Sequence, residues 1–438
     1  MPSSATVALP PSLVGLLERF RPCFTAPTFE TFCMLMAGFI ACAGTRAVCG
    51  MLTGAGLARV WPHDRAHAFF ARRRWSAEHL GLTLARLVVD LLIGEGESVL
   101  VAVDDTLFRR RGKKVWAASW FHDGSAPEAH ASGYGNNWVI CAIVVWLPFM
   151  TRPVALPVLA GLVKKGTVSA SRLEVARRLV TALAQALPGR RIDVVGDAAY
   201  AGGVLKNLPQ AVSWTSRLRK DAALYGLPPA PAPRRRGRPA LKGARLPAMV
   251  QLAAGLDFTE VVVTRYRRTE TVRAASLVCL WYGVFGTRPV QVVVIQSASG
   301  ALEVALVSTD LDATIGQVIE RYAARWSIET AILEAKQIFG VGQARNRTAR
   351  AVQRTVPFGL AAQTLTVCWY AQHGKHDRDL AAHQNARPWY TSKTTISIAD
   401  AHAALRRALL AAKYRMARPD QPKPEEILAD LLAWEDAA

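Results

Sequence analysis

The sequence predicts an α/β protein whose mixed core is interrupted by a mostly β segment and flanked by helical regions at both ends. Three patterns predict this class. Helix-type apolar spacing covers residues 13–97, short hydrophobic runs that end on aspartate follow up to residue 200, and a proline-rich stretch at 227–233 precedes further strand-like runs. A chain of 438 residues is long enough to fold as two or three domains.

Residues 1–95 are predicted to form a helical N-terminal domain. Apolar residues recur at helical spacing, as in residues 29–36, and basic and aromatic residues cluster at 61–75. Glycines at 94 and 96 then end the pattern. A helix-turn-helix in this domain would place a helix in the major groove of DNA, although helical packing alone explains the same spacing. The net charge of the chain leads us to expect DNA binding here.

Residues 96–200 are predicted to form the first part of the α/β core. Two hydrophobic runs, at 98–106 and 192–197, have the character of short buried strands with carboxylates near their C-terminal ends. Between them the patterns predict two strands and an amphipathic helix with a serine cap, at 139–147, 153–162 and 169–187. The predicted order is therefore three strands, a helix and a strand.

Residues 201–308 are predicted to interrupt the core as a mostly β insertion domain. The segment contains a proline-rich linker, which is too stiff and too poor in donors for a regular element. Strand-like runs separated by glycine-containing turns follow at 258–265, 273–282 and 290–296. The core is predicted to resume at 309–350, and residues 351–438 to form a helical C-terminal region.

The charge of the chain predicts a polyanionic partner. Lys and Arg number 54 against 33 Asp and Glu, which gives a formal net charge of +21. Nucleic acid is the usual partner of such a protein, so we expect double-stranded DNA. Two clusters carry much of the charge, one with Lys113 and Lys114 beside three arginines at 109–111, the other at 234–245. The members of the second cluster that we expect to touch DNA are Arg234, Arg235, Arg236 and Arg238.

Several classes of protein are not supported by the sequence. The seven cysteines are odd in number and include no Cys-x-x-Cys pair, which is typical of reduced core residues and not of disulfides or a zinc site. The longest apolar run, at 138–150, is too short to span a bilayer. No phosphate-loop motif is present, so we expect no ATP dependence. We expect a cytoplasmic protein.

The segment from 321 to 336 carries the most informative pattern. It contains no Pro or Gly and is rich in Ala, Ile and Glu, so a helix is predicted. Tyr322, Arg325, Glu329 and Lys336 stand at relative positions 0, 3, 7 and 14, which places them within roughly 60° of one another on one stripe. Such a stripe is suited to holding a metal ion and gripping phosphates. Glu334 is rotated by about 140° from Glu329 and is expected to face away.

Three carboxylates, one from each strand end and one from this helix, form a candidate two-metal site. Glu329 is the helix member. Asp197 is the second member, with Asp193 on the same face of its strand as an alternative. Asp104 and Asp105 are adjacent, so only one of them can point into the site, and the sequence leaves both open. Two-metal sites of this kind catalyse in-line displacement at phosphorus.

These residues resemble the bacterial insertion-sequence transposases with a DDE triad, within them the group with a Tyr-(2)-Arg-(3)-Glu-(6)-Lys signature. The signature is intact as Tyr322, Arg325, Glu329 and Lys336. The resemblance implies an RNase H-like core for the α/β part of the chain. It also favours Asp104, which precedes Thr106 by two residues, with Asp105 in reserve. The implied catalytic and metal-binding set is Asp104, Asp197 and Glu329.

The resemblance also implies an activity, its partners and a bacterial protein that is associated with the nucleoid when bound to DNA. The chain would bind the terminal inverted repeats of its element, cleave the DNA ends and transfer the 3′ hydroxyls to target DNA, with two Mg²⁺ or Mn²⁺ ions and as a homo-oligomer. Tyr322, Arg325 and Lys336 would grip phosphates, and Trp281 could stack a flipped base, although a core position explains a tryptophan equally well. The arginines at 234–238 resemble a minor-groove hook, or form a general phosphate-binding loop. The alternatives are a catalytically inactive DNA-binding regulator and an RNase H-like nuclease that cuts without joining.

Overall fold

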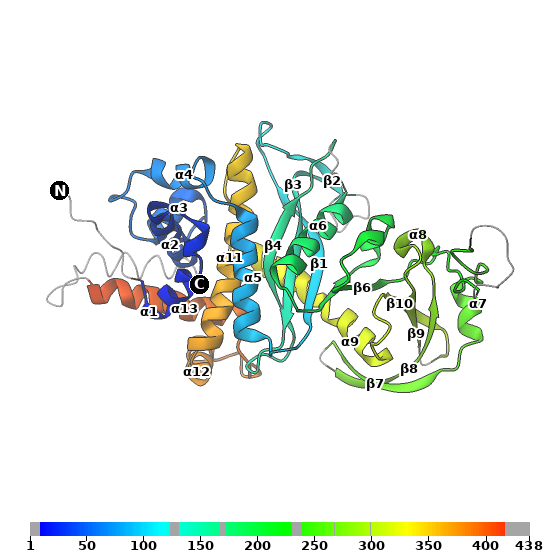
Figure 1. Ribbon diagram of the computed structural model, residues 1–438. Coiled ribbons are helices and arrows are strands. Elements are labelled where there is room, and N and C mark those ends of the chain that lie inside the picture. The colour runs from blue at the N-terminus through cyan, green and yellow to red at the C-terminus, as the bar shows by residue number, and fades with distance from the viewer. Residues whose placement is uncertain are drawn as a thin grey trace.

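A computed structural model describes residues 9–122, 131–166, 171–229, 239–266, 268–297 and 299–416. The N-terminal and C-terminal helices lie together at one side, a large sheet occupies the middle, and the later strands lie at the far side (Figure 1). The basic run at 234–238, predicted to touch DNA, lies outside the described residues.

Ten strands form one mixed sheet in the order β2-β3-β1-β5-β6-β10-β9-β8-β7, with β4 paired to β3. The antiparallel pairs β1–β3 and β3–β4 are followed by the parallel pairs β1–β5 and β5–β6. The predicted order of three strands, a helix and a strand is present, with one addition: the short strand β2 lies between β1 and β3, where a loop was predicted. The arrangement is consistent with an RNase H-like core. The strands are β1 (Val99–Arg109), β2 (Ser119–His122), β3 (Ser132–Val145), β4 (Val154–Leu162), β5 (Ile192–Gly196), β6 (Val212–Arg217), β7 (Thr259–Arg265), β8 (Arg268–Cys279), β9 (Val290–Gln296) and β10 (Leu302–Ser308).

Residues 201–308 supply strands to this same sheet. β6 continues the parallel part of the core beside β5, and β9, β8 and β7 extend the sheet beyond β10. The strands of the predicted insertion are therefore hydrogen-bonded to the core through β10. They also build a smaller apolar cluster against α9, which includes Val263, Ile295 and Ile319.

The helices at the two ends of the chain share one core with the sheet. α5 and α11 pack on each other and on β4, and α13 packs on α2 and α11. Arg354 of α11 ties the two ends together by donating to the main-chain carbonyls of Phe70 and Trp75. The helices are α1 (Pro11–Glu18), α2 (Ala26–Ala41), α3 (Val48–Gly54), α4 (His63–Ala71), α5 (Ala77–Leu92), α6 (Arg172–Ala186), α7 (Met249–Ala254), α8 (Tyr282–Phe285), α9 (Ile315–Ala324), α10 (Trp326–Gln337), α11 (Ala349–His373), α12 (His376–Ala386) and α13 (Ile398–Met416).

The predicted helix at 321–336 is present but divided. α9 starts with a capping box on Thr314, and α10 follows after a single residue, Arg325, whose dihedral angles (φ −52°, ψ −36°) are still helical. The amide of Arg325 donates to the carbonyl of Tyr322 at 3.1 Å, and the Ser327 hydroxyl donates to the carbonyl of Ala324 at 2.7 Å. A serine that bonds back to the preceding turn competes with regular helical bonds, and a helix can bend there. None of the helices in the described ranges is long and apolar enough to cross a membrane.

Candidate active site

β1 carries two adjacent aspartates that face in opposite directions. Asp105 is held by the Tyr200 hydroxyl at 3.1 Å, by Asn137 Nδ2 at 3.0 Å and by Arg172 Nε at 3.2 Å. Arg172 begins α6, which packs on β3 and β4. Asp104 instead faces the junction of α9 and α10, where its Oδ2 lies 3.9 Å from an Arg325 nitrogen. The geometry therefore places Asp104, and not Asp105, on the side of Glu329.

Asp197 lies beside Asp104 because of strand register. β1 and β5 are parallel, with Ala102 opposite Val195, so two more residues along each strand bring Asp104 next to Asp197. The Asp197 carboxylate accepts from the Ala199 amide at 2.8 Å, which fixes the turn after β5. Gly196 is required at this turn, since a Cβ there would lie 2.9 Å from the Cβ of Tyr200. The ends of two neighbouring strands thus bring two carboxylates together.

The electrostatics of Asp104 reflect this crowding. Burial raises the pKa of Asp104 to about 7, and the negative charges of Asp105 and Asp197 add to the increase, while Arg325 opposes it. Burial also raises the pKa of Tyr200 well above its ordinary range, with the same carboxylates contributing. A carboxyl group in this state favours an additional positive charge beside it. Perturbed carboxylates of this kind are concentrated at functional sites.

Arg325 lies between two of the predicted metal ligands. One of its terminal nitrogens donates to Glu329 Oε1 at 2.8 Å, and the other is the group that faces Asp104. The Nε of Arg325 is buried and has no hydrogen-bond partner among the described residues. Within the described ranges, no three His, Cys, Asp or Glu side chains converge closely enough to hold a metal ion. A guanidinium group, and not a cavity, therefore separates Asp104 from Glu329 in this structure.

Tyr322 and Lys336, the other two residues of the signature, have different neighbours. The Tyr322 ring centre lies 5.8 Å from the guanidinium carbon of Arg325. Burial raises the pKa of Tyr322, partly opposed by the charge of Arg325. Lys336 Nζ lies 5.6 Å from the ring of Phe108, which stands four residues after Asp104 on β1. Tyr322 therefore lies beside Arg325, and Lys336 lies beside the later part of β1.

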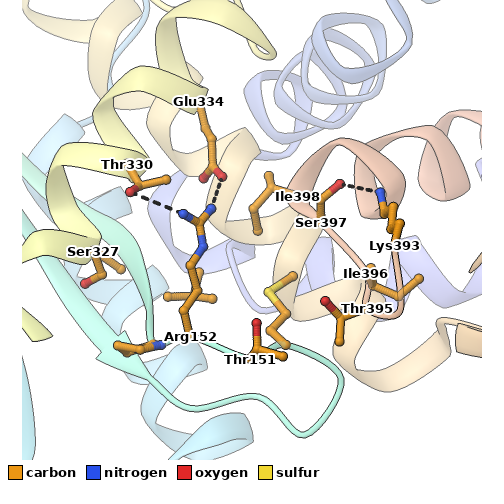
Figure 2. Close-up of a pocket in the computed structure, with 14 residues that line it drawn as sticks. Thr151, Arg152, Ser327, Thr330, Glu334, Lys393, Thr395, Ile396, Ser397 and Ile398 are labelled. Carbon is orange, nitrogen blue, oxygen red and sulfur yellow. Dashed lines mark hydrogen bonds and ion pairs between the residues drawn. The ribbon is translucent and has the colours of Figure 1, made fainter. Parts of the chain in front are cut away.

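Glu334 lies in a different environment, as the helical rotation predicts. It pairs with Arg152 at 3.0 Å and lines a cavity of about 250 Å³ with Thr330 and Ser397 (Figure 2). Burial raises the pKa of Glu334 to about 7. This glutamate belongs to the packing between α10, the segment before β4 and the start of α13.

Asp193, the alternative to Asp197, is a packing residue. It is 1% exposed, accepts from the Ser213 hydroxyl at 2.6 Å, and pairs with Arg191 at 3.1 Å and Arg321 at 3.2 Å. Asp310 pairs with the same two arginines. Burial alone would raise the pKa of Asp193, but the hydrogen bond from Ser213 and the charge of Arg321 outweigh it and lower the pKa.

Three further predicted residues lie away from the carboxylates, one in the core and two on the surface. Trp281 is 5% exposed and packs edge-on against Phe285, so the base-stacking role expected of it has no support here. Lys113 and Lys114 are exposed in the turn after β1. The sequence analysis did not find the partners of Asp105. For Tyr200, only its place three residues after a strand-end aspartate signals its role.

Comparison with known proteins places these observations in a family. The chain is an α/β protein whose sheet and neighbouring helix present acidic side chains beside an arginine. A family model described as DDE superfamily endonuclease matches residues 19–277, more than half of the chain, and the chain belongs to this family. Members of this superfamily use divalent metal ions. Comparison with curated proteins gave no match.

One solved structure is similar in a general way. It is described as a cryo-EM structure of a piggyBac transposase synaptic complex with hairpin DNA. The similarity has a TM-score of 0.42 and 13% sequence identity, and it covers 97% of this chain and 81% of that one.

Proposed function

We propose that this protein is a DNA transposase of the insertion-sequence type with the Tyr-Arg-Glu-Lys signature. It would bind the terminal inverted repeats, cleave the DNA ends and transfer the 3′ hydroxyls to target DNA. The observation that carries the proposal is the position of Asp104 beside Asp197 with Glu329 across Arg325, in a chain of the DDE endonuclease family with a net charge of +21.

The donor set fits a divalent cation of the magnesium type, because carboxylate oxygens are its preferred protein ligands. Asp104, Asp197 and Glu329 would hold the metal. When bound, two such ions supply activation of the attacking oxygen and neutralisation of charge on the leaving oxygen. The raised pKa of Asp104 supports this assignment, since a carboxyl group crowded by other carboxylates gains most from a cation.

The remaining residues of the site would act on the DNA. Arg325 pairs with Glu329 in this structure, and a cation at the carboxylates would release its guanidinium for a phosphate oxygen. Tyr322, beside Arg325, and Lys336, beside Phe108, would hold neighbouring phosphates. Asp105 would act as a positioning residue, because its three donors fix the end of β1 from the other side.

The test is cleavage of DNA that carries the flanking repeats of the element, with Mg²⁺ or Mn²⁺, by wild type, Glu329→Gln and Glu334→Gln. The two glutamates lie on one helix, so Glu334→Gln controls for folding and for loss of a carboxylate. We expect cleavage and joined products with wild type and Glu334→Gln, and a loss of about 10³-fold with Glu329→Gln. Cut but unjoined products would favour a nuclease. DNA binding by all three proteins without cleavage would favour a regulator.

A further inference from the structure

An arginine-lined cavity lies where β1 ends and where the loop after α10 returns to it. Its volume is about 600 Å³, and the loops after β1 and α10 both line it. No carboxylate is present among the described residues that line it. The charged side chains of this arginine cavity are Arg109, Arg110, Arg111, Arg345 and Arg347.

Other basic cavities of the molecule contain their own counter-charges. A cavity of about 800 Å³ beside α12 and α13 includes Arg407, which pairs with Asp379 in the same lining. A third, of about 580 Å³, includes Arg191, which pairs with Asp310 there. The arginine cavity differs from both because its lining supplies only neutral oxygens, so the balancing negative charge must come from outside the lining.

Arg110 shows this imbalance most directly. Its Nε donates to Asn136 Oδ1 at 3.0 Å, and one terminal nitrogen donates to the carbonyls of Gly342 at 3.0 Å and Ala344 at 2.6 Å. The other terminal nitrogen is buried and has no hydrogen-bond partner among the described residues. A buried guanidinium held only by neutral acceptors is costly unless an anion completes it.

The loop after α10, which lines one side of the cavity, is held in place by its backbone conformation and by hydrogen bonds. Gly342 has φ +95°, and a Cβ there would lie 2.3 Å from the Phe108 ring, so only glycine fits. The Trp116 amide donates to the Arg347 carbonyl at 3.0 Å, and Gln343 accepts from the Arg46 amide at 2.8 Å. These bonds hold the exposed Arg345 and Arg347 in position beside the end of β1.

We propose that this cavity binds the phosphodiester backbone of duplex DNA and positions the flank of the segment that reacts at the carboxylates. The inference rests on the proposed function and adds a contact site to it. β1 carries Asp104 and ends at Arg109, five residues or roughly 16 Å further along. A separation of this size lies within the length of one duplex, so the same DNA molecule could contact both places. Backbone contacts of this kind fix register without reading sequence.

The test compares Arg345→Ala/Arg347→Ala with a matched control, Lys375→Ala/Arg378→Ala. The control removes two exposed positive charges at the start of α12, which lies at the opposite end of the molecule from β2 and the end of β1 (Figure 1). All three proteins are titrated with a labelled duplex in EDTA over a range of salt concentrations. Each lost phosphate contact should lower the slope of log K against log salt by about 0.9 and weaken binding about tenfold at low salt.

We expect the plot of log K against log salt to be shallower by about 1.8 for the cavity variant than for wild type, on DNA of any sequence. The control should keep the slope of wild type. Equal slopes for wild type and the cavity variant would overturn the inference and leave the proposed function intact. A wild type that does not bind duplex DNA would overturn both. Inorganic phosphate is titrated in parallel by calorimetry. Phosphate binding that the cavity variant loses, with an unchanged DNA slope, would show a free-anion site and overturn the assignment to DNA.

Discussion

Asp104 and Asp193 lie on neighbouring strands of the sheet, and each faces an arginine from the same helical segment. Asp193 has a hydroxyl donor and two arginines within 3.2 Å, and its pKa is lowered. Asp104 has one amide donor, with Arg325 at 3.9 Å, and its pKa is raised to about 7. Both are acidic residues on buried strands, yet only one has its negative charge compensated by the fold.

The difference separates a carboxylate used for packing from one available for a ligand. Arg321 and Arg325 are four residues apart, and the first completes a buried ion network while the second spans two carboxylates without fully pairing with Asp104. Incomplete pairing in a buried position costs stability, and proteins retain it where function requires it. Mutation of each aspartate should therefore have opposite effects on stability.

The largest effect is expected for Asp193→Asn. The change leaves Arg191 and Arg321 with only Asp310 as a carboxylate partner, in a position that is 1% exposed. Breaking a buried ion pair costs about 3–5 kcal/mol. Because Asp310 still pairs with both arginines, we expect a loss at the lower end of this range, about 3 kcal/mol. Urea unfolding at pH 7 in EDTA measures it. Asp104→Asn is the matched comparison and should not destabilise the protein. An equal loss in both variants would contradict the distinction.

Much of this arrangement could be predicted from the sequence. The spacing of Tyr322, Arg325, Glu329 and Lys336 predicted one helical stripe, and the two strand-end aspartates predicted carboxylates at one edge of the sheet. Helical rotation also predicted that Glu334 faces away, which its pairing with Arg152 confirms.

Contacts between distant segments could not be predicted. The choice between Asp104 and Asp105 depends on Tyr200, Asn137 and Arg172, which come from three other elements. The division of the helix at Arg325 is accompanied by a hydrogen bond from the Ser327 hydroxyl to the Ala324 carbonyl, which the residue pattern does not indicate. The arginine cavity joins residues more than 230 positions apart, a relation that local pattern does not carry.

A change of pH is expected to have a smaller effect on the free energy of unfolding, and its sign is opposite for the two aspartates. Without metal, Asp104 has a folded pKa of about 7, above its unfolded value of about 4, so its ionisation destabilises the fold progressively from about pH 4 to 7. Because the side chain is partly exposed, we expect about 1–3 kcal/mol. Asp193 has a lowered pKa, so its contribution is present above about pH 4 and is lost as the pH falls through the folded pKa.

Urea unfolding in EDTA at pH 5 and pH 8 separates the two. Asp104→Asn should gain stability over wild type at pH 8 and little at pH 5. Asp193→Asn should lose stability at both values, since both lie above the pKa of its carboxyl group. A gain for Asp104→Asn that is the same at both pH values would show that the burial of its charge is not the cause.

The smallest effect is expected from a divalent cation on the melting temperature. An ion that binds the folded state at ten times its dissociation constant adds about 1.4 kcal/mol, which in a chain of this length raises Tm by about 1–3 °C. Wild type and Asp193→Asn should both show this rise with MnCl₂ at pH 7.5, because Asp193 lies in its own ion network. Asp104→Asn should not. A rise that Asp104→Asn retains would place the cation elsewhere, and the contrast between the two aspartates would then concern packing alone.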